Sequence, residues 1–105
     1  MSKSKSTTQI KVPVELVEHI LMCYDVKKQP MICVEELAEL QQAISKECRG
    51  ALGANIPEEI AHSLISISVI MTIYGINPVD IEYEIKKKQI KLGMRVDEKE
   101  DKTNE

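Results

Sequence analysis

Two short stretches of this 105-residue sequence gather side chains that can bind a cation. "EELAEL" places Glu36 and Glu39 three residues apart, and "PEEIAHSL" places Glu59 and His62 at the same spacing. Positions three apart share a face of an α-helix, so each pair can converge on one point. Carboxylates gathered in this way repel each other unless a cation neutralises them, and oxygen ligands on facing helices suit magnesium or manganese. The spacing therefore indicates a divalent-cation site shared by two helices.

The elements that must position these pairs are helices, because the sequence shows helical periodicity and little β-alternation. A proline in the first turn is typical of helices, and each expected helix has one near its start. Cys33, Leu37, Leu40, Ile44 and Cys48 form the apolar stripe expected on the second helix. We expect four helices, at about residues 13–25, 30–48, 55–74 and 77–92.

The expected third helix has no formally charged residue after Glu59, which is typical of a helix surrounded by protein. Short loops between the helices favour antiparallel neighbours. The fold prediction is all-α, a four-helix antiparallel bundle completed by oligomerisation, because so short a chain buries little apolar surface alone. Residues 10–96 would form this domain, with residues 1–9 and an acidic tail at 97–105 expected to be disordered.

Composition disfavours several other classes of protein. The formal net charge of −3 equals that of the tail, which holds five acids and two lysines, so the body is near neutral and lacks a basic stripe for nucleic acid. Three widely spaced cysteines favour buried thiols over a disulfide framework. No apolar segment follows the polar N-terminus, and the apolar run 64–74 is shorter than the ~20 residues of a membrane span. We expect a cytoplasmic protein that contacts neither nucleic acid nor membrane.

The acidic stretches also carry a family resemblance. "EELAELQQAISKECRG" followed by "NIPEEIAHSLISISVIMTIYGI" resembles the MazG-like nucleotide pyrophosphohydrolases, all-α enzymes that are related to dimeric dUTPases. Their motif is EExxE, a spacer, and then ExxD. Glu35, Glu36 and Glu39 match its first part, Glu59 matches the second, and the likeness covers about residues 13–95. Short members of this family are common in phages and bacteria.

The resemblance implies hydrolysis of a nucleoside triphosphate, NTP or dNTP, to the monophosphate and pyrophosphate by a homodimer or homotetramer. Glu36, Glu39 and Glu59 would hold Mg²⁺, and Glu35 or Glu36 would orient or deprotonate the attacking water. Lysine and arginine side chains at the ends of the second and fourth helices are candidates for binding the triphosphate. These candidates are Lys46, Arg49, Lys88 and Arg95.

His62 departs from the family pattern, because it stands where the motif has aspartate. An imidazole removes one negative charge and offers a softer nitrogen ligand, which suits manganese, iron or zinc better than magnesium. Three interpretations stay open for this position. The site works with an altered metal preference such as Mn²⁺, the protein is an impaired relative that binds nucleotides or a protein partner without turnover, or His62 packs beside the helices and binds nothing. A helical interaction module whose acids only face solvent is the fourth alternative for the protein as a whole.

Overall fold

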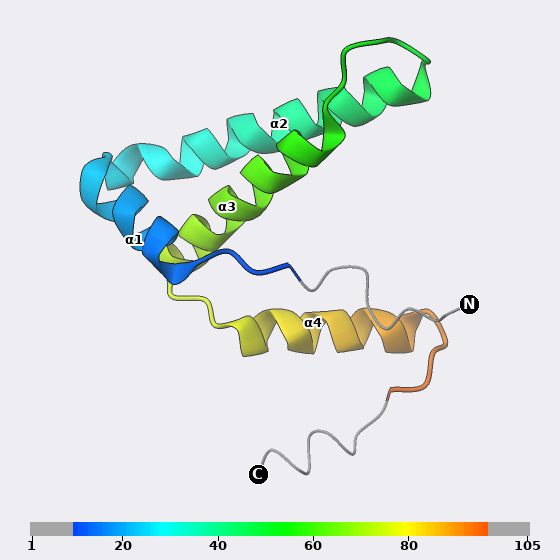
Figure 1. The fold of residues 1–105 in the computed structure, drawn as a ribbon. Coiled ribbons are helices and arrows are strands. Elements are labelled where there is room, and N and C mark those ends of the chain that lie inside the picture. The colour runs from blue at the N-terminus through cyan, green and yellow to red at the C-terminus, as the bar shows by residue number, and fades with distance from the viewer. Residues whose placement is uncertain (1–9, 97–105) are drawn as a thin grey trace. The chain divides into compact units, whose positions relative to one another are not determined.

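The computed structural model describes residues 10–96, and these residues form helices and no strands (Figure 1). The all-α fold class is thus confirmed for the part of the chain described. The expected disorder of 1–9 and 97–105 concerns residues outside the described range. The elements are α1 (Val14–Cys23), a 3₁₀ helix η1 (Val26–Lys28), α2 (Gln29–Cys48), α3 (Ile56–Tyr74) and α4 (Pro78–Lys91).

The chain divides after Tyr74 into two units, and each unit is described by itself. The first unit contains α1, η1, α2 and α3. Figure 1 shows α2 and α3 side by side and antiparallel, joined by the loop 49–55, with α1 packed against α3. The second unit contains α4, none of whose residues is buried.

The α2–α3 contact supplies most of the small core of the first unit. Cys33 and Ala43 of α2 are buried, as are Ser63 and Val69 of α3. Val17 adds the buried side chain of α1. The small side chains of Ala43 and Ser63 suit close approach of the two helices, and the Ser63 hydroxyl donates a hydrogen bond to the backbone carbonyl of Glu36 at 3.5 Å. The pairs Glu36/Glu39 and Glu59/His62 are therefore carried by two helices in direct contact.

The packed face of α2 differs from the stripe expected from the sequence. Cys33 is buried and Leu40 is half-buried, but Leu37, Ile44 and Cys48 are exposed. The observed face instead includes Glu36 and Ala43. Within the single chain, α3 therefore packs on the side of α2 that carries the small alanine and the acid, and three positions of the expected stripe remain uncovered.

The helix boundaries follow local signals in the sequence. α1 ends at Cys23 rather than near Asp25, because the Asp25 carboxylate accepts a hydrogen bond from the Lys27 N–H at 3.0 Å and starts η1. At the end of α2, Gly50 adopts a φ of 74°, and the Ala51 N–H donates to the Lys46 carbonyl at 2.9 Å. This is a Schellman motif, which turns the chain back towards α3.

The start of α3 is fixed by Asn55, whose side-chain oxygen accepts a hydrogen bond from the Glu58 N–H at 3.2 Å. The expected cap is therefore confirmed. The start of α4 is fixed in a related way, because the Asn77 N–H donates to the Asp80 carboxylate at 3.0 Å. Helix α4 thus begins at Pro78, as the sequence indicated.

Helix α3 is long and apolar enough to cross a membrane by length and composition. Its 19 residues extend beyond the uninterrupted run 64–74 on which the sequence expectation relied. Length and composition are weak evidence here, because α3 also packs against α2 and carries Glu58, Glu59 and His62 in its first two turns. The expectation that the protein contacts no membrane stays a prediction.

Val69 offers a test of the α2–α3 core, since its side chain is only 2% exposed. We expect Val69→Ala to lower the free energy of unfolding by about 1–3 kcal/mol, because two methyl groups leave a packed site. The matched control is Leu52→Ala, because Leu52 is 93% exposed and its truncation should change stability by less than about 0.5 kcal/mol. Chemical denaturation of both variants measures the difference, and equal stabilities would contradict the assigned core.

Candidate metal centre

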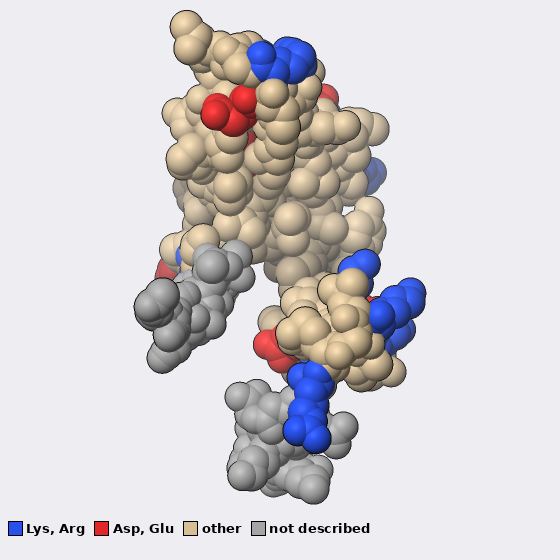
Figure 2. Space-filling view, turned by 90° about the vertical axis from the view of Figure 1, so that its right-hand side faces the viewer, with Lys and Arg blue, Asp and Glu red and all other residues tan. Residues whose placement is uncertain are grey.

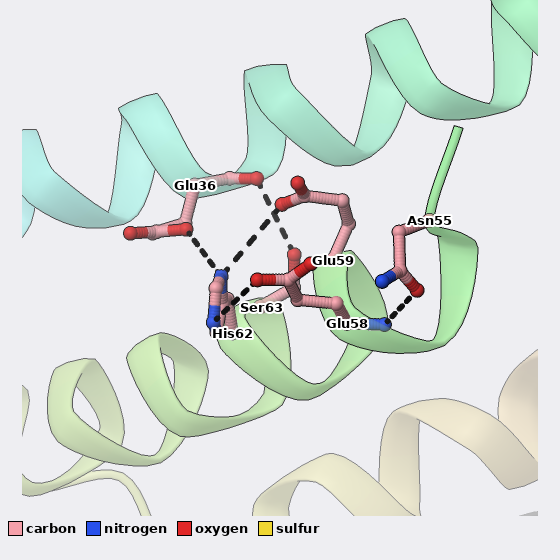
Figure 3. A network of polar contacts seen from close by, with 6 residues as sticks. All are labelled: Glu36, Asn55, Glu58, Glu59, His62 and Ser63. Carbon is pink, nitrogen blue, oxygen red and sulfur yellow. Dashed lines mark hydrogen bonds and ion pairs between the residues drawn. The ribbon is translucent and has the colours of Figure 1, made fainter. Parts of the chain in front are cut away.

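The structure brings together four of the residues singled out in the sequence. Glu36, Glu39, Glu59 and His62 each offer one ligand atom, and these atoms all lie within 4.8 Å of one another. Two come from α2 and two from α3, so the site exists only where the helices pack. Figure 3 shows three of them, Glu36, Glu59 and His62. This convergence is the arrangement that the spacing predicted.

His62 lies at the centre of the cluster. Its Nδ1 atom is 3.5 Å from Glu36 Oε1 and 3.8 Å from Glu59 Oε1, whereas its Nε2 atom is 4.0 Å from Glu58 Oε2. Figure 3 shows Glu36 and Glu59 joined to one ring nitrogen and Glu58 joined to the other. His62 therefore lies among the acids of the cluster, and its part in binding an ion stays a prediction.

Two oxygens of the cluster are buried without a hydrogen-bond partner. Glu36 Oε1 and Glu59 Oε1 accept no hydrogen bond from the described residues, although both lie near His62. Their side chains are only 27% and 21% exposed. Burying an oxygen of this kind without a partner costs roughly 1–3 kcal/mol, so a ligand that binds both oxygens would relieve the penalty. The alternative that these acids only face solvent does not fit Glu36 and Glu59.

The electrostatics of Glu36 reflect the same crowding. Burial raises the pKa of its carboxyl group, and the charges of Glu39, Glu59 and Glu35 raise it further, while His62 opposes them. Burial also raises the pKa of the neighbouring Cys33 thiol, with a contribution from Glu36. The cluster thus disfavours additional negative charge and favours a cation.

The donor set fits a divalent metal ion. Three carboxylates and one imidazole are common ligands of divalent ions, and unpaired buried oxygens already point into the site. Glu39 is the exposed member of the set, so one side of the site is open to solvent. An open side is required if a bound ion is also to contact a substrate.

The other predicted site residues lie outside the four-residue cluster. Glu35 is exposed next to Glu36 and acts on it through charge. Lys46 and Arg49 lie further along α2, where they line a hollow of about 190 Å³ with Gln42 and Ser45.

In that hollow, Arg49 Nη1 donates a hydrogen bond to Ser45 Oγ at 2.6 Å. Lys88 and Arg95 belong to the second unit, so their predicted part in substrate binding stays a prediction.

Sequence reasoning did not single out Glu58 or assign Cys33 a place beside the acids. Glu58 precedes His62 by four residues, which places both on one face of α3. That spacing was the signal available in the sequence. Which ring nitrogen faces Glu58 and which faces Glu59 depends on the rotamer of His62. Both glutamates in fact contact the ring, one at each nitrogen.

Glu36→Gln tests the charge balance of the cluster. Because the folded-state pKa of Glu36 is raised above its ordinary value of 4.5, its contribution to stability is fully present below pH 4.5 and is lost as the pH rises through the raised pKa. In the presence of a chelator we expect the variant to melt about 1–4 °C higher than wild type at pH 7 and to match it below pH 4.5. Thermal melts followed by circular dichroism measure this.

The control is Glu47→Gln, which removes an exposed acid of α2 outside the cluster. It should not reproduce the pH-dependent difference. A Glu36→Gln protein that is less stable than wild type at pH 7 would show that attraction to His62 outweighs repulsion among the acids.

Comparison of the chain with protein-family models, with curated proteins and with solved structures finds no match.

Proposed function

We propose that the chain is a nucleoside triphosphate pyrophosphohydrolase that depends on a divalent cation, as its resemblance to the MazG-like enzymes implies. The observation that carries the proposal is the convergence of Glu36, Glu39, Glu59 and His62 from two helices. These are the motif positions of the resemblance, and they meet at one point although nineteen residues separate Glu39 from Glu59 in the sequence.

The reaction would cleave an NTP or dNTP between its α- and β-phosphates. Water attacks the α-phosphorus, pyrophosphate leaves, and the nucleoside monophosphate remains. A divalent ion supplies charge neutralisation for the phosphate oxygens when it is bound, and Glu36, Glu39, Glu59 and His62 would hold it. The chain's own residues would orient the water and accept its proton.

Glu36 and Glu35 are the two candidates to accept that proton. Burial and its neighbours raise the pKa of Glu36 in the ion-free site, so it would accept the proton only while it is not a ligand of the ion. Glu35 is exposed beside it and would act where Glu36 is occupied as a ligand. Lys46 and Arg49, further along the same helix, are candidates for the triphosphate tail because Lys46 shares the Glu39 side of α2.

One observation favours a second function. Because His62 Nδ1 lies near both Glu36 Oε1 and Glu59 Oε1, a protonated imidazole would neutralise the two acids without a metal. The protein would then be an impaired relative that binds nucleotides or a protein partner without turnover. Activity measurements separate the two proposals.

The hydrolase proposal predicts release of pyrophosphate from at least one NTP or dNTP in the presence of Mg²⁺ or Mn²⁺. Phosphorus NMR of the products distinguishes pyrophosphate from orthophosphate and thereby identifies the cleaved bond. We expect Glu36→Gln to reduce kcat by about 10²-fold or more, because it removes a charged ligand of the ion. Glu47→Gln on the same helix should keep wild-type activity.

Absence of turnover across the eight common nucleotides and dUTP would reject the hydrolase. If nucleotides still raised the melting temperature, the non-catalytic relative would be favoured. A gain of turnover in His62→Asp would identify the histidine as the cause of the loss.

We further propose that a second copy of the chain completes the bundle, as a homodimer or homotetramer. Leu37 and Ile44 share one side of α2, and Ile60 and Ile67 share one side of α3, yet all four are about two-fifths exposed in the single chain. Figure 2 shows that uncharged residues dominate the visible surface of the first unit. Uncovered apolar helix faces of this kind are typical of protein interfaces.

Ile67→Lys tests the assembly. A lysine on this side of α3 would have to be buried without a partner, so we expect the variant to shift towards the monomer mass in sedimentation or light-scattering measurements. Gln42→Lys adds the same charge at an exposed polar position of α2 and should leave the mass unchanged. A wild-type protein that is already monomeric at high concentration would contradict this part of the proposal.

A further inference from the structure

The two ring nitrogens of His62 face different side chains, and this difference bears on which ion the site would bind. Nδ1 faces the cluster, where Glu36 Oε1 and Glu59 Oε1 lie 3.5 Å and 3.8 Å away. Nε2 faces Glu58 Oε2 at 4.0 Å. Glu58 contributes no ligand atom to the four-residue cluster.

We propose that His62 binds the ion through Nδ1, that Glu58 orients the ring from Nε2, and that the site therefore prefers a first-row transition ion such as Mn²⁺, Fe²⁺ or Zn²⁺ over Mg²⁺. This inference rests on the metal site of the proposed function. It concerns the identity of the ion and the role of Glu58, neither of which the hydrolase proposal requires.

Glu58 is suited to this positioning role by its location. It precedes His62 by one helical turn on α3, and its own N–H is fixed by the Asn55 cap. A carboxylate that accepts a hydrogen bond from the Nε2–H holds the neutral ring in the tautomer whose Nδ1 lone pair is free to bind metal. The Glu58 side chain is 53% exposed, so it has room to shorten the 4.0 Å separation when the ring binds an ion.

The chemical types of the ligand atoms determine which ion the site binds most tightly. Mg²⁺ favours oxygen ligands in a near-ideal octahedron, whereas imidazole suits later divalent ions. With His62 in the set, the protein supplies three carboxylates and one nitrogen rather than four carboxylates. The loss of one negative charge and one oxygen ligand lowers the affinity for Mg²⁺ more than the affinity for ions that bind nitrogen well.

The experiment measures ion binding directly, without nucleotide. Metal-free full-length protein is titrated with Mn²⁺ and with Mg²⁺ by calorimetry, for wild type and for His62→Asp, after circular dichroism has established that both are folded. We expect wild type to bind Mn²⁺ more tightly than Mg²⁺, and the ratio of the two affinities to fall by about tenfold or more in His62→Asp. An unchanged ratio would overturn the preference assigned to His62.

Two substitutions at Glu58 distinguish its proposed role in orienting the ring from the effect of its negative charge on ion binding. Glu58→Ala removes both the charge and the hydrogen-bond acceptor, and we expect it to weaken Mn²⁺ binding by about 10–100-fold. Glu58→Gln removes the charge but keeps an acceptor oxygen, so it should recover most of the affinity. Equal losses in both variants, shared by Mg²⁺, would show that Glu58 acts only through its charge and would overturn the positioning role.

Nitrogen NMR measures the chemical shifts of the histidine ring nitrogens, which would not change if His62 had a purely structural role. The chain has two histidines, so His19→Gln identifies the signals of His62. With Zn²⁺ as a diamagnetic probe, we expect the Nδ1 resonance of His62 to report metal binding while Nε2 keeps its proton. Binding at Nε2, or no change at either nitrogen, would overturn the assignment.

The outcomes also distinguish this inference from the hydrolase proposal. If wild type and His62→Asp bind Mg²⁺ and Mn²⁺ with the same ratio and hydrolyse nucleotides, the inference fails and the hydrolase stands. If the predicted preference is found without any nucleotide turnover, the inference stands and the hydrolase fails. Wild-type protein that binds no ion, alongside His62→Asp that does, would mean that the imidazole itself neutralises the acids and would overturn the inference.

Discussion

The concentration of negative charge at the α2–α3 contact is the constraint on which the site depends. Glu36 lies on the packed face of α2, so its carboxylate is held near Glu59 by the same contact that buries Ser63 and Ala43. A solvent-exposed acid would turn away from its neighbours, but here burial and backbone packing prevent this for Glu36. The chain therefore keeps a repulsive arrangement that a positive charge, or a proton on Glu36, can relieve, and a metal ion would supply that positive charge.

Local signals in the sequence predicted the helices well, since each is bounded by short-range chemistry. Asn55 and the glycine-containing turn after α2 act within a few residues of the helix ends, so their effect can be read without tertiary structure. The convergence of the two acidic pairs was also predictable, because spacing fixes the face of each helix and a short loop fixes the antiparallel pairing. The packed face of α2 was not predictable from hydrophobicity, because it holds Glu36 in place of Leu37.

The role of His62 could be only partly read from the sequence. Its register with the aspartate of the MazG-like motif pointed to it as a member of the site, and the structure places it beside the acids. Which ring nitrogen faces the acids depends on a side-chain rotamer, which is set by the surroundings of α3 and not by spacing. The proposed part of Glu58 depends on the same rotamer, because a carboxylate near the second nitrogen of a histidine ligand would set the tautomer of the ring.

The chemistry of the site is tied to what covers the rest of α3. After His62 the helix carries no charged residue, and its apolar side chains at Ile60 and Ile67 remain exposed in the single chain. A second copy packed on these positions would exclude water near the cluster and strengthen every electrostatic interaction inside it. Any ion that binds the assembled form better than the single chain must, by linkage, also favour assembly. In the proposed assembly, a second copy on the apolar length of α3 and an ion at the charged start of the same helix would therefore stabilise each other.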